Sequence, residues 1–231
     1  MKKIKKTKQS KSPSFFPFLF GKTPKVIHFR EGKMEFTVDV ASGQKSGGFL
    51  DLRSLRKWLA SQNLRGLRIL NLFSYTGMLG LAAESAGAKE IWNVDVSQGA
   101  VDFGKQFHCV EPKRYRFIAT DIFTWIERLR YSEKFDLILV DPPSMVSRTS
   151  QVPGALKAYR RLYHACREHL SKKGRIVACC CTTRIPRPVF DRETKRNLSP
   201  MRLEHSFRPE SDHPVGFREG DYLKILVFGS G

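Results

Sequence analysis

Short apolar runs alternate with segments of helical periodicity between residues 68 and 180 of the chain. The apolar runs predict strands at 68–75, 90–96, 116–121, 135–141 and 175–180. The segments between them predict helices at 77–86, 98–108, 122–129 and 154–170. Buried strands separated by helices of about ten to fifteen residues are typical of βαβ units. We therefore expect a parallel sheet with helices on both faces.

The pattern changes at both ends of this region. After residue 200, the runs at 201–208 and 222–228 are joined by a polar loop, which predicts a terminal antiparallel pair of strands. Before residue 60, residues 26–40 alternate around a Glu-Gly turn, which predicts a β-hairpin that caps the ligand cleft. The predicted fold class is α/β: a doubly wound, mostly parallel seven-stranded sheet with a terminal antiparallel strand, plus an N-terminal β-hairpin.

The length of 231 residues fits one large domain with short additions. We expect a flexible basic arm at 1–24, the hairpin with a linker at 25–60, and the main domain at 61–231. The apolar content of 41% supplies the material for a core. The longest apolar runs, such as 137–140, are far shorter than the ~20 residues that a membrane-spanning helix needs, which excludes a transmembrane protein.

The net charge of +19 is unevenly distributed along the chain. Residues 1–60 carry 14 basic and 4 acidic side chains, residues 61–145 carry 10 of each, and residues 146–231 carry 17 and 8. A neutral middle between two basic segments favours a polyanionic partner shared by the two ends, and nucleic acid is the leading candidate. The alternative is a solvated tail together with ordinary surface lysines and arginines.

Five cysteines, three of them consecutive at 179–181, do not fit a disulfide framework, because adjacent cysteines pair only under strain and the count is odd. This usage is typical of a reducing compartment, so we expect a cytoplasmic protein. Consecutive strand residues point to opposite faces, and no CxxC pattern or histidine cluster completes a tetrahedral set. We therefore expect no metal site.

Distinctive residues close each predicted parallel strand, where an open α/β sheet binds its ligand. The first strand ends in Phe73-Ser74-Tyr75-Thr76-Gly77, which lacks the GxGxxG pattern and so argues against NAD or FAD. The next three strands end in Asp95-Val96, in Asp121-Ile122 and in Asp141-Pro142. The first of these acids can accept both ribose hydroxyls, and the second can accept an adenine amino group. A single strand-end Asp is more often a helix cap, but these motifs together predict a site for S-adenosylmethionine.

Six stretches of the chain carry a family resemblance: GQKSGGFLDLR at 43–53, LNLFSYTG at 70–77, VDVS at 94–97, KFDLILVDPP at 134–143, DHPV at 212–215 and GDYLK at 220–224. With these motifs, residues 28–229 resemble the bacterial 23S ribosomal RNA cytosine-C5 methyltransferase family, which usually carries an N-terminal PUA domain. The resemblance implies a class I methyltransferase (Rossmann-like) fold with S-adenosylmethionine as cofactor. It also adds Phe49, Asp51 and Arg53 to the cofactor pocket.

The chain departs from that family at two places. The basic arm stands where the PUA domain would be, and Ser144 follows the Asp-Pro-Pro sequence where some cytosine-C5 enzymes have a cysteine that releases the product. Product release would then need another base. Asp141 is also a candidate acceptor for the amino group of the target cytosine.

Cys181 is the candidate nucleophile, because the family places Cys followed by Ser or Thr at the end of the fifth strand and Cys181-Thr182 holds that position. Carbon 5 of a pyrimidine becomes nucleophilic when a thiolate adds at carbon 6. Cys179 and Cys181 share one strand face and Cys180 takes the other, so at most one of the three is expected to reach a substrate. The alternative is that all three are small buried core residues, as free cysteines usually are.

Basic side chains flank the candidate nucleophile on both sides, as phosphate contacts to RNA require. The candidate RNA-binding residues are Lys157, Arg160, Arg161, Arg184 and Arg187. The prediction is thus an S-adenosylmethionine-dependent RNA methyltransferase acting on ribosomal RNA and forming 5-methylcytosine. The alternatives are an RNA guanine N-methyltransferase of the same fold without a cysteine nucleophile, and a non-catalytic RNA-binding module. A small-molecule methyltransferase leaves the charge unexplained, and the sequence does not determine the oligomeric state.

Overall fold

The computed structural model describes residues 24–40, 47–210, 215–217 and 220–230, and all structural statements below concern these residues. The arm predicted at 1–24 lies outside them except for its last residue, as do 43–46 and 212–214 of the motif stretches. The strands are β1 (Val26–Glu31), β2 (Met34–Asp39), β3 (Arg68–Leu72), β4 (Glu90–Asp95), β5 (Tyr115–Ala119), β6 (Phe135–Val140), β7 (Leu170–Cys180), β8 (Arg202–Ser206) and β9 (Lys224–Gly229). The helices are α1 (Arg53–Ser61), α2 (Met78–Ser85), α3 (Gln98–Phe107), α4 (Ile122–Arg128), α5 (Val152–Glu168) and α6 (Arg187–Leu198), with a 3-10 turn, η1 (Leu50–Leu52), before α1.

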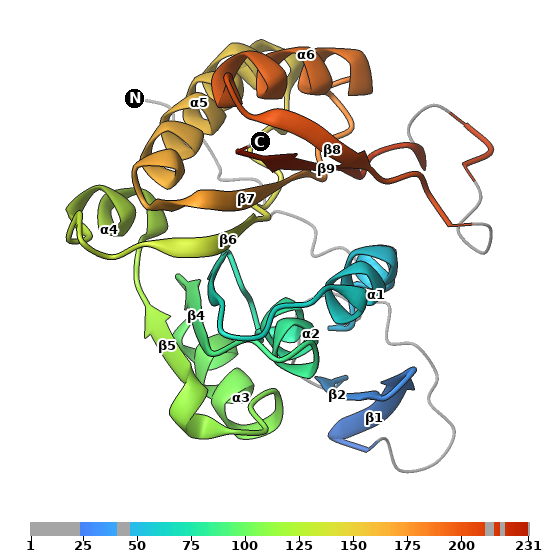
Figure 1. The fold of residues 1–231 in the computed structure, drawn as a ribbon. Helices are drawn as coiled ribbons and strands as arrows, with labels where there is room; N and C mark the ends of the chain where they lie inside the picture. The colour runs from blue at the N-terminus through green and yellow to red at the C-terminus, as the bar shows by residue number, and fades with distance from the viewer. Residues whose placement is uncertain (1–23, 41–46, 211–214, 218–219, 231) are drawn as a thin grey trace, which may run out of the picture.

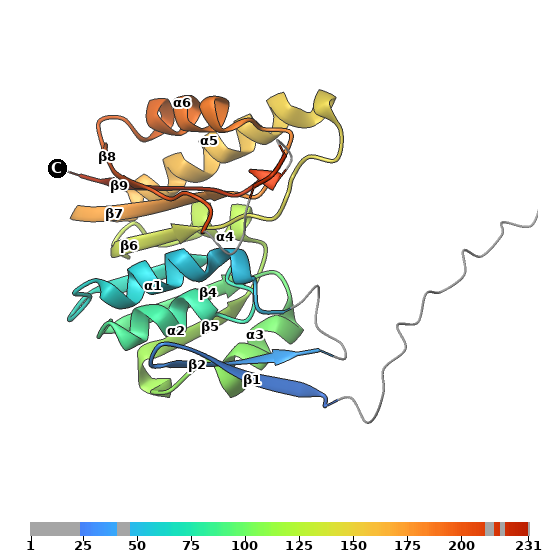
Figure 2. The same ribbon diagram turned by 90° about the vertical axis from the view of Figure 1, so that its right-hand side faces the viewer.

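One seven-stranded sheet runs through the molecule in the order β5-β4-β3-β6-β7-β9-β8 (Figure 1). Strands β3 to β7 pair in parallel, whereas β9 is antiparallel to both β7 and β8. A separate antiparallel hairpin is formed by β1 and β2. The predicted fold class is confirmed, including the terminal antiparallel pair. In Figures 1 and 2 the hairpin lies beside α2, outside the main sheet.

Two helices were not expected from the sequence. Residues 53–61, which we assigned to a linker, form α1, whose Leu55 and Leu59 are fully buried. Helix α6 is strongly polar and buries few apolar side chains, chiefly Phe190 and Leu198, so its periodicity is weak in the sequence. Strand β7 also begins at Leu170, five residues before the predicted start, because Leu170 pairs with Phe135 of β6 and the regular pairing resumes at Arg175 after an irregularity.

Alternating side chains of the central strands fill two cores, one on each face of the sheet. In β6, Leu137 and Leu139 belong to the core with α1 and α2, whereas Ile138 and Val140 belong to the core with α4, α5 and α6. A strand buried on both faces reads as a continuous apolar run, which is why it was recognisable in the sequence. No described helix is both long and apolar enough to cross a membrane.

A buried ion pair attaches the hairpin to the rest of the fold. Arg56 of α1 donates from Nε and Nη2 to the carboxylate of Glu31, at 2.7 and 2.5 Å, and from Nη1 to the carbonyl of Phe49 at 3.1 Å. The side chains of Arg56 and Glu31 are 1% and 5% exposed. Removing one partner of such a pair leaves an uncompensated charge, at a cost of about 3–5 kcal/mol. The pair therefore fixes the hairpin and the turn at Phe49 to the same helix.

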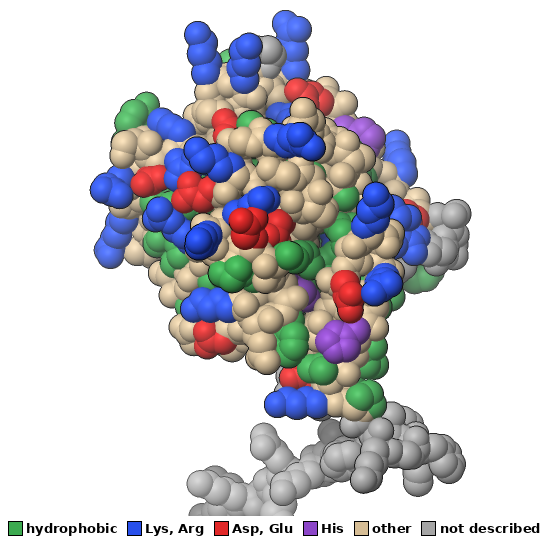
Figure 3. Space-filling model, turned by 60° about the horizontal axis from the view of Figure 1, so that its bottom comes forward, with side chains coloured by type: hydrophobic (Ala, Val, Ile, Leu, Met, Phe, Trp, Pro, Cys, Tyr) green, Lys and Arg blue, Asp and Glu red, His purple; other side chains and the backbone are tan. Residues whose placement is uncertain are grey.

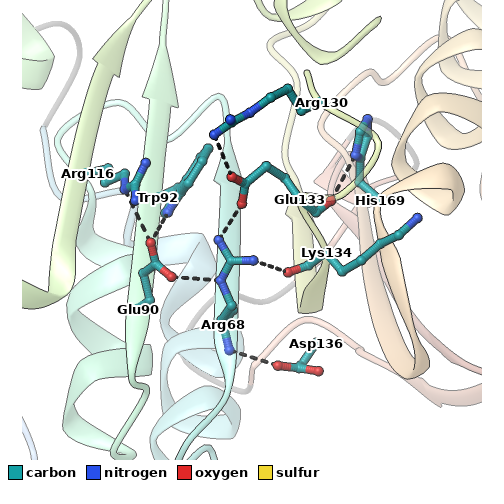
Figure 4. Close-up of polar contacts among 9 residues, drawn as sticks. All are labelled: Arg68, Glu90, Trp92, Arg116, Arg130, Glu133, Lys134, Asp136 and His169. Carbon is teal, nitrogen blue, oxygen red and sulfur yellow. Dashed lines mark hydrogen bonds and ion pairs between the residues drawn. The ribbon is translucent and has the colours of Figure 1, made fainter. Parts of the chain in front are cut away.

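At the amino ends of the strands, the guanidinium of Arg68 connects β4, β3 and the segment before β6 (Figure 4). Arg68 donates to the carboxylates of Glu90 and Glu133 at 2.7 Å each, and to the carbonyl of Lys134 at 2.8 Å. Its backbone N–H donates to Asp136 at 2.9 Å. Burial, which opposes the charge, is outweighed by these carboxylates, and the pKa of Arg68 is raised. The network fixes the stagger of the central strands, and hence where their carboxyl ends meet.

The carboxyl side of the sheet depends on close backbone packing at glycines. A Cβ on Gly80 would lie 2.6 Å from the Oδ1 of Asn93, and a Cβ on Gly104 would lie 2.6 Å from the carbonyl oxygen of Thr76. Real Cβ contacts are essentially never shorter than 3.0 Å. Helices α2 and α3 thus approach β4 and the loop after β3 at a distance that only glycine permits.

We expect Gly104→Ala to lower the free energy of unfolding by about 1–3 kcal/mol, because the new methyl group meets backbone that moves only if the loop after β3 moves. The control is Gly99→Ala in the same helix, where nothing lies within 4 Å of the added Cβ. It should leave stability unchanged or slightly raised. Urea denaturation of both variants measures the difference, and equal stability of the two would contradict the packing constraint.

Candidate cofactor and nucleophile site

The sequence-predicted site residues gather at the carboxyl ends of the parallel strands. The chain moves outward from β3 to β4 and β5 on one side, and returns to β6 and β7 on the other. The strand order therefore reverses between β3 and β6, which is where ligands bind in open α/β sheets. The loop 73–77 follows β3 at this point, and Asp141 follows β6, with its N–H 3.5 Å from the carbonyl of Leu72.

The loop 73–77 repeatedly enters the left-handed backbone region. Phe73, Tyr75 and Gly77 have φ angles of 60°, 49° and 82°. Non-glycine residues seldom adopt this conformation, and it persists where the surroundings impose it. Here Asp95 accepts the N–H of Tyr75 at 2.8 Å, and the N–H of Ser74 donates to the carbonyl of Val94 at 3.1 Å. The end of β4 thus holds the loop in its strained form.

His108 connects the same loop to the hairpin. Its Nδ1 donates to the carbonyl of Thr76 at 2.7 Å, and its Nε2 accepts the N–H of Thr37 in β2 at 3.1 Å. These two bonds require the neutral imidazole with its proton on Nδ1. The His108 ring is fully buried, and burial, with a further effect of the positive Arg56, lowers the pKa of the imidazole. His108 could not be predicted from the sequence, because both of its partners are backbone groups remote in the chain.

Asp95 and Asp121 lie at the predicted strand ends but make backbone contacts of their own. The two oxygens of Asp95 accept the N–H groups of Tyr75 and Ser97, which leaves each oxygen one further lone pair for a ligand hydroxyl. Asp121 is exposed and caps α4 by accepting the N–H of Thr124 at 2.8 Å. This bond and the hydroxyl of Thr124 lower the pKa of Asp121. The helix-cap interpretation considered for a single strand-end Asp thus applies to Asp121, whose role toward adenine stays a prediction.

The neighbours of Asp95 and Asp121 differ in exposure. Val96 is 72% exposed, so its side chain is available to a ligand, whereas Ile122 is 3% exposed and belongs to the core. The side chain of Ile122 therefore packs in the core and is not exposed to a ligand.

The residues predicted from the hairpin side also lie near this edge. The ring of Phe49, at a φ of 42°, meets the ring of Tyr75 edge to face with centroids 5.4 Å apart. Asp51 accepts the hydroxyl of Tyr222 at 2.7 Å, and Arg53 donates from Nε to Glu210 at 2.7 Å. The positive charge of Arg53 is therefore partly neutralised by the carboxylate of Glu210.

Two pockets include predicted cofactor residues. A pocket of about 140 Å³ lies between the η1–α1 region and the segments after β8 and before β9, and Asp51, Arg53 and Tyr222 line it. A second pocket of about 370 Å³ has walls from β2, from Tyr75 and Thr76, and from the start of α3. Asp51 and Arg53 thus face the C-terminal segments, whereas Tyr75 and Thr76 face the hairpin.

The chemistry of this edge fits S-adenosylmethionine. The carboxylates of Asp95 and Asp141 are acceptors for hydroxyl and ammonium groups, and the first turn of α2 after Gly77 presents amide N–H groups that suit a carboxylate. The hydroxyls of Ser74 and Thr76 are buried and have no hydrogen-bond partner within the described part of the chain. Such orphaned donors are expected where a polar ligand belongs.

Cys181 lies directly against the Asp-Pro-Pro loop. Its thiol is partly buried and donates to the carbonyl of Pro142 at an Sγ···O distance of 3.8 Å. The hydroxyl of Ser144 lies 3.3 Å from that of Thr182. Cys179 and Cys180 are 1% and 0% exposed and sit in opposite cores. The expected alternation is thus observed for Cys179 and Cys180, and Cys181 is the cysteine whose thiol reaches the Asp-Pro-Pro loop.

The five predicted RNA-binding residues do not form one set. Lys157, Arg160 and Arg161 lie exposed on α5, and Arg161 is paired with Glu127. Arg184 is exposed in the turn after β7. The structure differs from the prediction at Arg187. Its side chain is only 10% exposed, forms an ion pair with Asp221 and donates to the carbonyl of Leu223 at 2.9 Å. It links α6 to the segment before β9 and is not a surface cation for phosphate.

Within the described ranges, no group of three or more His, Cys, Asp or Glu side chains could hold a metal ion. A doubly wound sheet with this strand order, a strained loop after its first strand and an acid after its second defines a nucleoside-binding protein of the class I methyltransferase type. Residues 6–227 match the sequence model of a protein family that is described as S-adenosylmethionine-dependent methyltransferase. The chain therefore belongs to the S-adenosylmethionine-dependent methyltransferase family, and S-adenosylmethionine is its cofactor.

Individual proteins agree with this assignment. The chain is 31% identical over 224 residues to "Ribosomal RNA large subunit methyltransferase I" of Aeromonas hydrophila, covering 90% of this chain and 55% of that protein. It is 30% identical over 208 residues to "Ribosomal RNA large subunit methyltransferase" of Deinococcus radiodurans, covering 87% and 51%. The chain thus spans about half the length of the relatives it matches.

Among solved structures, the fold is similar to SMU.776, described as a putative methyltransferase complexed with SAH. The TM-score is 0.81 at 24% identity, covering 91% of this chain and 58% of that chain. At this identity the likeness concerns the fold, which it confirms independently of the sequence motifs.

The buried imidazole of His108 predicts a pH-dependent stability. In the unfolded chain it protonates near its ordinary pKa of 6.5, whereas in the folded chain the pKa is lowered. The unfolded state therefore binds more protons below pH 6.5, and stability present above that pH is lost as the pH falls toward the folded-state value. His108→Gln should be less stable than the wild type at pH 8 by about 1–3 kcal/mol, but should lose less on acidification.

Urea denaturation at pH 8 and pH 5.5 measures both effects. His164→Gln is the matched control, because His164 lies on the exposed side of α5, and its pH dependence should stay close to that of the wild type. A wild-type stability that is flat between the two pH values would exclude this role of His108.

Proposed function

We propose that this protein is an S-adenosylmethionine-dependent methyltransferase acting on RNA, specifically on ribosomal RNA, and that it forms 5-methylcytosine with Cys181 as nucleophile. The observation that carries the proposal is the contact between Cys181 and the Asp-Pro-Pro loop, in which the thiol lies 3.8 Å from the carbonyl oxygen of Pro142. This contact supports a common site, because it brings the thiol that follows β7 next to the loop that begins with Asp141 at the end of β6.

The chemistry assigns a separate task to each group. S-adenosylmethionine supplies a methyl group bound to a sulfonium centre. The Cys181 thiolate would add to carbon 6 of cytosine, so that carbon 5 gains the electron density needed to take the methyl group, while the bond between the methyl group and the sulfonium sulfur breaks and a neutral thioether leaves. A base then removes the proton of carbon 5, and the bond between sulfur and carbon 6 breaks to return the thiolate. Asp141 would accept the amino group of the cytosine, and Pro142 and Pro143 would keep the loop extended against the base.

The RNA part of the proposal rests on charge and on the relatives. The relatives from Aeromonas and Deinococcus are named ribosomal RNA large subunit methyltransferases. On the face shown in Figure 3, Lys and Arg side chains are spread widely, with fewer acidic side chains between them. The exposed cations Lys157, Arg160 and Arg184 are proposed as phosphate contacts, and the basic arm at 1–24 as a second one. A ribosomal RNA substrate and free cysteines also agree with a cytoplasmic protein.

Cys181→Ala should abolish methyl transfer to RNA, a loss of at least about 10⁴-fold, and should leave S-adenosylmethionine binding intact. Cys109→Ala is the control, because Cys109 is also partly exposed but follows α3, and it should retain activity. Transfer of labelled methyl groups to ribosomal RNA and calorimetric titration of the cofactor give the two readouts. Full activity of Cys181→Ala would refute the covalent mechanism and favour direct attack by a base nitrogen.

The double variant Lys157→Ala/Arg160→Ala should flatten the salt dependence of RNA affinity. Each lost phosphate contact lowers the slope of log affinity against log salt by about 0.7–0.9, so a decrease of about 1.5 is expected. The control, Lys172→Ala/Lys173→Ala, removes the same charge from exposed positions near the start of β7, at the amino-terminal end of the strand. If both variants change the slope equally, the charge acts through the whole molecule and not through α5.

A further inference from the structure

Lys224 is a charged side chain placed where charge is costly. It is the first residue of β9 and is 1% exposed. Its Nζ donates to the carbonyl of Thr182 at 2.7 Å and to the carbonyl of Ile185 at 2.9 Å. Burying an ammonium is unfavourable unless bonded groups replace its water, and neutral carbonyls compensate only in part. Burial accordingly lowers the pKa of Lys224.

The two carbonyls belong to the turn that follows the proposed nucleophile. This turn, residues 182–185, carries the chain from β7 to α6, and Thr182 is the residue next to Cys181. In the sheet, Lys224 is the antiparallel partner of Cys180, so its side chain extends beyond the strand end into the turn. Arg187 and Asp221 make a second link between the same two segments. The start of β9 therefore determines how the chain leaves β7, and with it the direction of the Cys181 side chain.

The ammonium is bonded to the carbonyl of Thr182, the residue next to Cys181, and it interacts electrostatically with the thiol. Tyr159 of α5, Cys179 of β7, Tyr222 and Lys224 are among the titratable groups that interact electrostatically with Cys181. Within this group, Lys224 carries a positive charge. A Cys181 thiolate raises the pKa of Lys224, and the coupling is reciprocal, so the ammonium favours the thiolate.

Other charged groups modulate the ammonium. Asp221 and Cys180 favour its charged form, and Arg187 opposes it. Because Arg187 and Asp221 are paired with each other, their effects largely cancel. On the thiol side, Asp141 and Asp51 add negative charge near the cysteines. The lysine is thus placed to offset the carboxylates that the cofactor and the target base require.

We propose that Lys224 is a positioning residue for the reactive thiol: it fixes the turn 182–185 and stabilises the Cys181 thiolate through a buried ammonium. The proposal rests on the proposed role of Cys181. It explains why a charged residue occupies a buried sheet position where an apolar side chain would pack at lower cost.

The test measures the thiol directly, without RNA or methyl transfer. Iodoacetamide alkylates only the thiolate, forming a carbon–sulfur bond with loss of iodide after the thiol proton has gone to solvent. The alkylation rate at Cys181 is followed by tandem mass spectrometry between pH 6 and pH 10. It gives the midpoint, which is the pH at which half of the Cys181 thiol is ionised. Lys224→Met should raise this midpoint by about one unit, which is about a tenfold slower alkylation at pH 7. At pH 10 the rates should approach the wild-type rate.

Two further variants separate charge from packing. Lys224→Arg keeps the charge and the donors and should restore the midpoint, whereas Lys224→Gln keeps an N–H donor without charge and should behave like Lys224→Met. Lys173→Met removes an exposed lysine from β7 and should leave the midpoint unchanged. Cofactor titration and thermal unfolding show which variants fold, and Lys224→Gln replaces Lys224→Met if the latter does not.

A folded neutral variant with the wild-type midpoint overturns the proposal. So does a Lys173→Met variant with the same shift, since the effect would then come from net charge. The outcome does not depend on the proposed function: if Cys181→Ala kept full activity, the covalent mechanism would fail, while the effect of Lys224 on the thiol would still be measured.

Discussion

The strained loop after β3 is the constraint on which the site depends. Phe73, Tyr75 and Gly77 adopt left-handed backbone conformations there. Three contacts from two elements hold the loop: Asp95 at the end of β4, His108 at the C-terminus of α3, and the close approach of Gly104 of α3 to the carbonyl of Thr76. Since strain of this kind costs of order 1–3 kcal/mol per residue, the surrounding contacts must over-determine the loop. Asp95 takes part in this support through one lone pair of each oxygen, which leaves it able to accept a ligand hydroxyl as well.

The same logic extends to the hairpin. His108 joins the loop to β2, and the buried pair of Arg56 and Glu31 joins β1 to α1. The hairpin is therefore not an independent appendage, because a buried polar contact connects each of its two strands to the main fold. The turn at Phe49, which presents Asp51 to the site, is fixed by the same Arg56. The hairpin, the turn at Phe49 and the loop 73–77 are thus held together by the same set of buried contacts.

The C-terminal strands contribute as much to the site as the parallel ones. Tyr222 meets Asp51, Asp221 meets Arg187, and Lys224 reaches the turn after Cys181. These contacts come from the GDYLK stretch, and they explain physically why a short polar segment before a buried strand is built from these residues. The antiparallel pair closes the sheet and also fixes the proposed nucleophile relative to the Asp-Pro-Pro loop. Cofactor and nucleophile regions are in this way held by different parts of the chain.

The sheet could be predicted from the amino-acid sequence, because the signals of its strands are local. Strands buried on both faces, such as β3 and β6, read as apolar runs. The residues that follow these strands led to the prediction of Asp95, Asp141 and the loop 73–77 as site residues. The polar helix α6 escaped prediction, since so few of its residues face the core.

The remaining features depend on contacts between residues that are far apart in the chain. It showed that Arg187 serves an internal ion pair, that Asp121 caps a helix, and that His108 and Lys224 bond to carbonyls far along the chain. A side chain reveals its own chemistry in the sequence but not its partner. The free energy of a buried charge or imidazole depends on that partner, and folding alone brings the two together.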